Sequence, residues 1–241
     1  MRSSSRKGKL WLTGETMRKR IILVHAYLPS MAPIVDAFAR LWPQAEVLNL
    51  LDESIYADVG ADGVLPKDVW SRVDGLLRQA SQSRADGIVF TGATFGPAVE
   101  AARQAIALPI LKADEAMCEE LAQSEGRVAV LCTAPRALPV IRAGIQSAAS
   151  ALGRAPPEIV EFAIPAAKDA LVRGDDLLHD HLIAEAIMGA SDCSSIALGQ
   201  ISMTGARMLA PLALAERIVV SPECSVRKMR RLLATDEGGR P

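Results

Sequence analysis

Short apolar runs alternate along the chain with longer segments in which apolar residues recur every three or four positions. Residues 21–25 form a continuous apolar run, which is typical of a parallel strand covered on both faces. Residues 31–42 place Met31, Ile34 and Phe38 on one side of a helix, with Pro33 tolerated in its first turn. Similar patterns predict further strands at residues 45–50, 87–91, 109–112, 127–132, 158–162, 195–199 and 217–220. They predict further helices at residues 66–82, 96–106, 114–124, 135–152, 166–173, 175–190, 204–216 and 225–234.

This alternation predicts an α/β fold in which parallel strands are joined by right-handed helical crossovers. Residues 51–65 interrupt it with a polar, glycine-containing segment that is long enough to be a functional flap.

The strand-to-helix junctions repeat at a nearly constant spacing. The junction at residues 88–95 resembles the one at residues 196–203, an offset of 196 − 88 = 108. Two further junctions repeat at offsets of 130 − 23 = 107 and 219 − 110 = 109. All parallel α/β units resemble one another, which is the alternative explanation, but a shared offset favours duplication. We therefore predict two pseudo-symmetric lobes, each a parallel sheet flanked by helices, with a ligand cleft between the carboxyl ends of the two sheets.

The repeat also suggests where the lobes begin and end. We assign residues 17–115 plus 217–235 to the first lobe and residues 116–216 to the second. Residues 1–16 are expected to be a disordered basic tail, or the product of a start codon placed too early. Residues 236–241 are expected to be a second disordered tail.

Composition narrows the possible partners and compartments. The formal net charge is −1 and no basic stripe crosses the folded part, which argues against a nucleic-acid partner. No apolar run approaches the roughly 18 residues that a membrane span needs. The basic start lacks the apolar stretch of a signal peptide, so we expect a cytoplasmic protein with four reduced cysteines. The sequence leaves open whether the chain forms a homo-oligomer.

The turn Thr91-Gly92-Ala93-Thr94 is the strongest candidate site, because it closes a buried strand and opens a helix. Gly92 allows a close backbone approach, and the N–H groups that follow it suit a carboxylate or phosphate. The alternative is that Thr94 only caps the helix that follows. By the repeat, Gln200 and Ser202 face this turn from the other lobe.

Other polar residues stand at strand ends on the same side. His25, Cys132, Thr133 and Cys224 end or follow strands there, although a lone histidine or cysteine at a strand end is usually a packing residue. His179-Asp180-His181 looks like a set of metal ligands. Residues two apart on a helix diverge, so we expect a solvated helix face and no metal site.

Several segments, which follow one another along the chain in the same order, resemble those of one known family. They are His25-Ala followed by Ser30-Met-Ala-Pro33, Asn49-Leu-Leu-Asp-Glu-Ser54, Asp86-Gly-Ile-Val-Phe-Thr-Gly-Ala-Thr-Phe-Gly96, Pro109-Ile-Leu-Lys-Ala-Asp-Glu-Ala-Met117 and Ala197-Leu-Gly-Gln-Ile-Ser-Met203. Together they look like the aspartate/glutamate/hydantoin racemase superfamily, and the resemblance covers residues 17 to about 234.

The resemblance implies cofactor-independent chemistry beside a carboxylate, in which backbone N–H groups and hydroxyls stabilise an enolate-like intermediate. In the racemases, one cysteine removes the α-proton and a second returns it. Arylmalonate decarboxylases keep only the second cysteine, and maleate isomerases use one as a nucleophile. Here the first cysteine position falls on Gly92 and the second on Gly199 or Gln200.

Two hypotheses follow. The first is a racemase, isomerase or decarboxylase acting on a small carboxylic acid, with Cys224 and Cys132 as the candidate catalytic thiols. The second is a non-catalytic carboxylate-binding or regulatory protein on the same scaffold. The residues expected to bind the small carboxylate are His25, Ser30, Thr91, Gly92, Ala93, Thr94, Thr133, Gln200 and Ser202.

Overall fold

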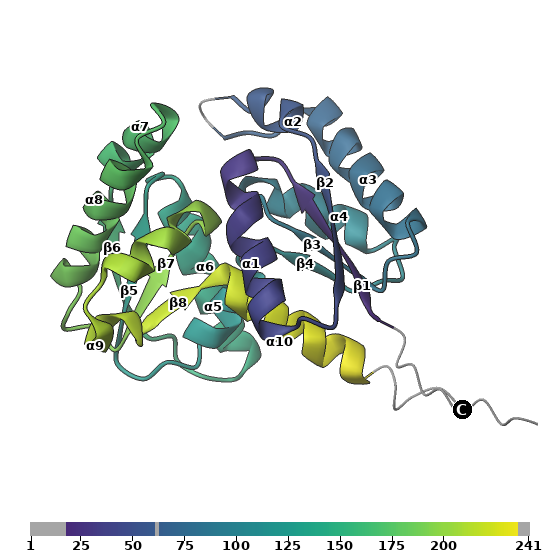
Figure 1. Ribbon diagram of the computed structural model, residues 1–241. Helices are drawn as coiled ribbons and strands as arrows, with labels where there is room; N and C mark the ends of the chain where they lie inside the picture. Colours follow the sequence, from purple (N-terminus) through teal and green to yellow (C-terminus); the bar gives the residue numbers. More distant parts are fainter. Residues whose placement is uncertain (1–17, 61–62, 236–241) are drawn as a thin grey trace, which may run out of the picture.

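The computed structural model describes residues 18–60 and 63–235, so both predicted tails lie outside the described residues. Strands of the described chain form two parallel sheets of four strands each (Figure 1). The first sheet contains β1 (Arg20–His25), β2 (Glu46–Leu51), β3 (Gly87–Phe90) and β4 (Ile110–Lys112) in the order β2-β1-β3-β4. The second contains β5 (Arg127–Cys132), β6 (Glu158–Ala163), β7 (Ser195–Leu198) and β8 (Ile218–Val220) in the order β6-β5-β7-β8. The two sheets therefore repeat one topology, and the predicted two-lobe α/β fold is confirmed.

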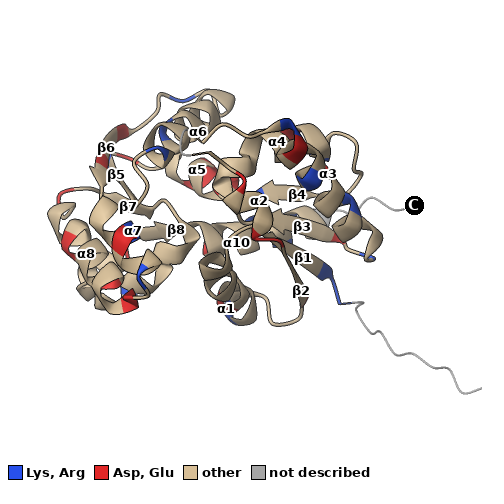
Figure 2. Cartoon of the chain, turned by 90° about the horizontal axis from the view of Figure 1, so that it is seen from above, with Lys and Arg blue, Asp and Glu red and all other residues tan. Residues whose placement is uncertain are grey.

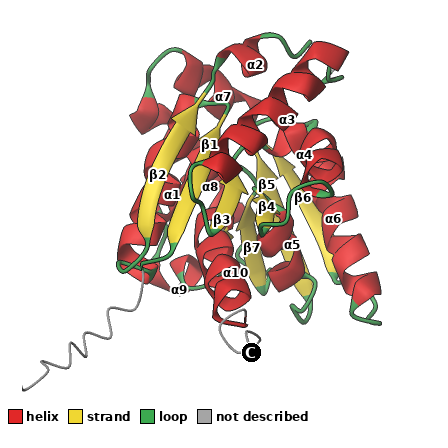
Figure 3. Cartoon of the chain, turned by 90° about the vertical axis from the view of Figure 1, so that its right-hand side faces the viewer, coloured by secondary structure: helices red, strands yellow, loops and turns green. Residues whose placement is uncertain are grey.

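Helices connect and cover these strands, as Figure 3 shows for both sheets. The first half of the chain contains η1 (Leu28–Ser30), α1 (Met31–Leu41), α2 (Ser54–Ala57), α3 (Lys67–Gln82), η2 (Ala93–Phe95), α4 (Gly96–Arg103) and α5 (Glu115–Leu121), where η marks a 3₁₀ helix. The second half contains α6 (Ala137–Ala151), α7 (Pro165–Val172), α8 (Asp176–Gly189), η3 (Ile201–Leu209), α9 (Leu212–Ala215) and α10 (Ser221–Thr235).

Each sheet buries both faces, which explains its continuous apolar strands. On β1, Ile22 and Val24 face α3 and α4, while Ile21 and Leu23 face α1 and α10. A side-chain period of two produces this alternation, and helices on both sides make every position apolar. The second sheet is built in the same way, with α5 and α6 on one face and α8 and η3 on the other.

The two lobes exchange their last helices. Helix α5 follows β4 of the first sheet, but Met117 and Leu121 lie in the core of the second lobe. Helix α10 follows β8 of the second sheet, yet Val226 and Met229 pack under the first sheet (Figure 1). Because each lobe relies on a helix from the other half of the chain, the two halves are bound together along α5 and α10.

This exchange corrects one predicted boundary. Residues 217–220 were assigned to the first lobe together with the rest of 217–235. The structure pairs β8 with β7 through the register Ile196↔Ile218, so this strand completes the second sheet. Only the helix that follows it covers the first lobe.

A second correction concerns the helix predicted at residues 204–216. The segment forms η3 and then α9 instead, with Ala210 extended at ψ 144° between them. Pro211 explains the break, because it lacks an N–H group and disfavours a helical conformation at the residue before it.

Charged side chains are dispersed over both lobes, with blue and red segments mixed in the view of Figure 2. Within the described residues, no helix combines the length and apolar character that crossing a bilayer requires.

Candidate functional site

A cavity of about 380 Å³ opens between the carboxyl ends of the two sheets. The turn after β3 supplies one wall through Thr91, Gly92, Ala93 and Thr94. The turn after β7 supplies the facing wall through residues 199–202. Two equivalent junctions, one from each lobe, thus enclose the same space, at the edge where parallel α/β sheets bind ligands.

Most of the residues expected to bind the carboxylate line this cavity. They are Ser30, Thr91, Gly92, Ala93, Thr94, Thr133, Gln200 and Ser202. His25 lies behind them, fully buried, and its Nδ1 is 2.9 Å from Thr91 Oγ1. The segment predicted as a flap also reaches the cavity, through Tyr56 and Gly63. Residues 61–62 of that segment lie outside the described residues.

The capping alternative for Thr94 is wrong. The N-cap positions of η2 and α4 are Gly92 and Phe95, and neither helix start has a side-chain capping hydrogen bond. The Thr94 hydroxyl lines the cavity instead, where it can donate to a bound carboxylate oxygen.

The side-chain amide of Gln200 fixes the turn after β7 through its oxygen, while its nitrogen has no hydrogen-bond partner. Its Oε1 accepts a hydrogen bond from the Thr133 backbone N–H at 3.0 Å, which ties the turns after β5 and β7 together. Its Nε2 is buried without a hydrogen-bond partner in the structure. A buried amide donor that lacks a partner is costly, so an acceptor supplied by a ligand would stabilise it.

Gly92 and Gly199, which the resemblance predicts at cysteine positions, differ in the space around them. A Cβ at Gly92 would lie 2.8 Å from Phe95 Cδ2 and 3.2 Å from Phe90 Cε1. A Cβ at Gly199 would lie 2.9 Å from the Leu131 carbonyl oxygen, a backbone atom that cannot turn away. A side chain is therefore blocked at 199, and Gln200 is the position that presents one on this wall.

The cysteine candidates lie in the core rather than at the cavity. Cys132 and Cys224 are both buried in the same apolar cluster as α5 and α6. Burial raises the pKa of Cys132 to about 12 and that of Cys224 further above its ordinary value. Neither sulfur lines the cavity, and neither thiol can ionise readily near neutral pH. The expectation that both reach the cleft is wrong. Cys132, the last residue of β5, faces the helix layer, and Cys224 lies in the first turn of α10 with its side chain in the same core.

The His179-Asp180-His181 set diverges as expected, but not onto one solvated face. His179 is buried and its Nδ1 is 2.9 Å from the Ala167 carbonyl oxygen, whereas His181 is exposed. In the part of the chain that the structure describes, no three metal-ligating side chains gather.

Three charged residues that sequence reasoning missed also line the cavity, namely Asp114, Arg136 and Lys168. Burial raises the pKa of the Asp114 carboxyl above its ordinary range. The signal for Asp114 was its place directly after the β4 junction. Arg136 and Lys168 reach the cavity from helical turns of the second lobe, which no strand-end pattern marks.

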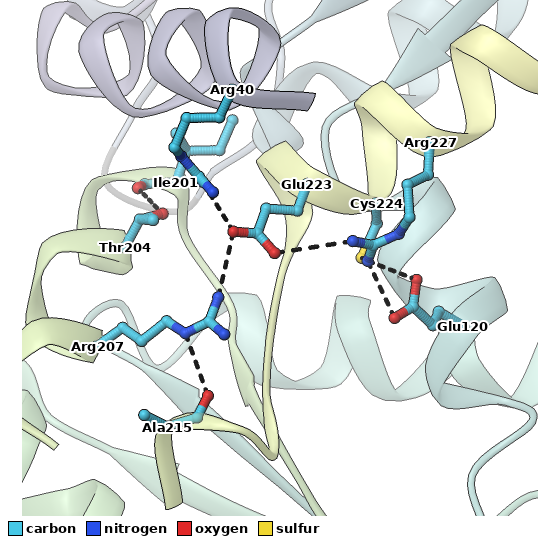
Figure 4. Close-up of polar contacts among 9 residues, drawn as sticks. All are labelled: Arg40, Glu120, Ile201, Thr204, Arg207, Ala215, Glu223, Cys224 and Arg227. Carbon is cyan, nitrogen blue, oxygen red and sulfur yellow. Dashed lines mark hydrogen bonds and ion pairs between the residues drawn. The ribbon is translucent and has the colours of Figure 1, made fainter. Parts of the chain in front are cut away.

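The wall that carries Gln200 is anchored to the first lobe by an ionic cluster on α10 (Figure 4). Glu223 accepts hydrogen bonds from Arg40 of α1 at 2.9 Å and from Arg207 of η3 at 3.2 Å. Arg227 lies 3.7 Å from the same carboxylate and pairs with Glu120 of α5 at 2.9 Å. Partial burial opposes ionisation, but the three guanidinium groups hold the pKa of Glu223 below its ordinary value.

A family model for Asp/Glu/hydantoin racemases matches residues 27–228. The chain belongs to this family. Among solved structures, an aspartate racemase homologue from Pyrococcus horikoshii OT3 superposes with a TM-score of 0.68 at 11% identity, over 90% of this chain and 99% of that one. Allantoin racemase from Klebsiella pneumoniae gives a TM-score of 0.67 at 18% identity, over 90% and 89%. An unliganded arylmalonate decarboxylase gives 0.55 at 17% identity, over 92% and 94%. No curated protein matches the sequence.

At these identities, the solved structures show a shared fold. The family match confirms the resemblance on which the sequence argument relied.

Proposed function

We propose that this protein binds a small carboxylic acid between its lobes and catalyses a cofactor-independent racemisation, isomerisation or decarboxylation at the carbon beside the carboxylate. The observation that carries the proposal is the pairing of two equivalent turns, after β3 and β7, around one cavity. A ligand held from both sides is positioned at its central carbon, which is what proton transfer requires.

Hydrogen-bond donors on both walls support carboxylate binding. Thr94 and Ser202 contribute hydroxyl groups from opposite lobes. Lys168 adds a positive charge at the rim. Such donors would also stabilise the charge that develops on the carboxylate when the neighbouring carbon loses a proton or carbon dioxide.

The alternative function is carboxylate binding without catalysis, and it is favoured by the finding that none of the four cysteines lines the cavity. A positioned acid or base contributes about 10²–10⁴-fold in rate, so the loss of both thiols would leave a protein that binds without turning over. This is the non-catalytic carboxylate-binding alternative.

The deciding experiment measures deuterium incorporation at Cα from D₂O, and carbon dioxide release, across amino acids, hydantoins and substituted malonates. Turnover of one class is expected. Thermal stabilisation by the same acids without exchange or carbon dioxide release would favour the binding protein instead. An absence of both stabilisation and turnover would overturn the proposal.

A variant pair tests the site itself. Ser202→Ala removes one hydroxyl from the cavity wall and should weaken carboxylate binding roughly tenfold, as expected for one hydrogen bond to a charged group. Ser71→Ala is the matched control, because Ser71 lies exposed on α3. Equal affinities for the two variants in isothermal titration would remove Ser202 from the site.

A further inference from the structure

Three polar side chains form a hydrogen-bonded chain that ends at the cavity. Asn49 on β2 places its Oδ1 2.9 Å from His25 Nε2. His25, the last residue of β1, places its Nδ1 2.9 Å from Thr91 Oγ1. Thr91 follows β3 and lines the cavity wall. The chain therefore crosses three neighbouring strands of the first sheet and connects a fully buried imidazole to the ligand space.

The partners fix the direction of each hydrogen bond. An amide oxygen only accepts, so Nε2 of His25 carries the proton and donates it to Asn49. In the neutral ring Nδ1 is then a lone pair, which accepts from the Thr91 hydroxyl. The other acceptor within reach of that hydroxyl, the Val24 carbonyl oxygen, is farther away at 3.3 Å. Burial lowers the pKa of His25, and this favours the neutral ring that the arrangement requires.

We propose that Thr91 is the acid–base residue of this cavity, with His25 accepting and returning its proton and Asn49 holding the imidazole in the Nε2–H form. The proposal rests on the function proposed above and supplies the group that Gly92 cannot. Nucleophiles and bases ordered by a third side chain follow the same logic in unrelated enzymes.

The proton transfer balances without another reactant. Thr91 Oγ forms a bond to the proton beside the substrate carboxylate while its own hydroxyl proton moves to His25 Nδ1. The electron pair of the broken C–H bond passes into the carboxylate as an enediolate, and the imidazole becomes an imidazolium. The reverse step returns the proton from the imidazolium through Thr91 to the carbanion. When loss of carbon dioxide forms the carbanion, the imidazole first takes a proton from solvent water, and Thr91 then delivers it.

The second lobe lacks the equivalent hydrogen-bonded chain, so this chain is not a consequence of the duplication. Strand register places Cys132 and Gly199 where the first lobe has His25 and Thr91. Glu161 stands where the first lobe has Asn49, and it pairs with Arg142 instead. Since Gly199 has no side chain, no relay can reach the cavity on that side. One acid–base group serves one face of the substrate, so this relay fits the isomerisation or decarboxylation of the proposed function, with protonation to a single enantiomer, and not its racemisation.

Charged neighbours of His25 are already paired. Asp52, which follows β2, donates its backbone N–H to the His25 carbonyl, while its carboxylate binds Arg72 of α3 at 3.0 Å. Across the strands the imidazole meets the neutral Asn49 and Thr91. Since burial lowers the pKa of His25, its titration is expected below the ordinary histidine pKa. Asp114, a cavity-lining carboxyl whose pKa burial raises, also titrates in acid, so the His25→Gln variant is needed to assign the titration.

The test combines a spectroscopic and a kinetic readout on the full-length protein. In ¹⁵N-histidine-labelled protein, the His25 signals are identified by their loss in His25→Gln. Long-range ¹H–¹⁵N correlation should show the Nε2–H tautomer, with the Nδ1 shift displaced in Thr91→Val. An Nδ1–H tautomer, or no displacement, overturns the relay.

Kinetics follow the substrate found by the exchange panel. Thr91→Val should lower kcat by about 10²–10⁴-fold with little change in KM, whereas Thr91→Ser should stay within about tenfold of wild type. His25→Gln should abolish the limb of the pH–rate profile that rises as the imidazole loses its proton. His181→Gln, at an exposed histidine of α8, is the control and should leave that limb unchanged.

The outcomes separate the two proposals. Wild-type turnover that survives Thr91→Val overturns the relay alone. A wild type that turns over no acid in the panel overturns the proposed function and the relay with it.

Discussion

Replacing Gly92 with alanine tests how tightly the turn after β3 is packed. Its backbone is extended at φ −100°, so a side chain causes no conformational strain. A Cβ there would nevertheless lie 2.8 Å from Phe95 Cδ2. Phe95 is fully buried and packs on Phe90 with ring centroids 5.6 Å apart, so it cannot turn toward solvent. The clash must be relieved by shifting this aromatic pair.

The magnitude follows from two opposing effects. Overpacking a filled core costs about 1–3 kcal/mol. The reduced freedom of alanine in the unfolded chain returns about 0.4–1 kcal/mol. The net loss should be about 1 kcal/mol, which lowers Tm by roughly 2–4 °C in a chain of this size.

Gly75→Ala is the matched control. Gly75 is exposed in the middle of α3, and a Cβ there would meet nothing within 4 Å. This variant should gain about 0.5–1 kcal/mol from helix propensity, so the two substitutions should change Tm in opposite directions.

The assay is thermal and urea unfolding of both variants, followed by Gly92→Ala in a Phe95→Leu background. The smaller side chain should reduce the cost of the added methyl group, which a double-mutant cycle measures. A Gly92→Ala protein that is stabilised as much as Gly75→Ala would refute the packing argument. For the same reason, Gly92→Cys alone should be destabilised and should not place a thiol at a ligand without a smaller residue at 95.

Three further predictions concern the frame of the site. Glu223→Gln should lower the free energy of unfolding by about 1–2 kcal/mol at pH 7, because it weakens partly buried hydrogen bonds to charged groups. The pKa of Glu223 is lowered in the folded state. Its contribution to the free energy of unfolding is therefore present above the unfolded-state pKa and is lost as pH falls through the folded-state pKa. In chemical denaturation, the stabilities of wild type and variant should converge in acid. Cys132 and Cys224 should react with iodoacetamide far more slowly in native than in urea-unfolded protein; equal rates by mass spectrometry would contradict their burial. Gly199→Ala should be more destabilising than Gly92→Ala, because its Cβ meets a backbone oxygen at 2.9 Å; a smaller fall in Tm would argue against that contact.

Sequence pattern determined the elements and the duplication. Continuous apolar runs predicted the inner strands of both sheets, such as β1 and β5, because helices cover both faces of these strands. The nearly constant offset near 108 residues predicted that the turns after β3 and β7 would correspond, and both line the cavity. These are local or periodic properties, which a linear sequence records directly.

The tertiary structure alone decided which segments meet. The exchange of α5 and α10 cannot be read from a pattern, because an amphipathic helix records that it has a buried face and not which sheet buries it. For the same reason β8 was assigned to the wrong lobe. The sequence likewise does not record whether Cys132, at the end of β5, and Cys224, in the first turn of α10, face the ligand or the core.

The Asn49–His25–Thr91 chain is the clearest case of an arrangement that the sequence does not record. His25 was a candidate from its place at a strand end, Thr91 from its turn, and Asn49 only as part of a resembling segment. Their hydrogen bonds depend on the strand order β2-β1-β3, which brings together residues 24 and 66 positions apart. The sequence by itself determined which side chains stand at the carboxyl edge of the sheet. The pairing of strands decided that these three touch, because hydrogen bonding is set by distance in space and not along the chain.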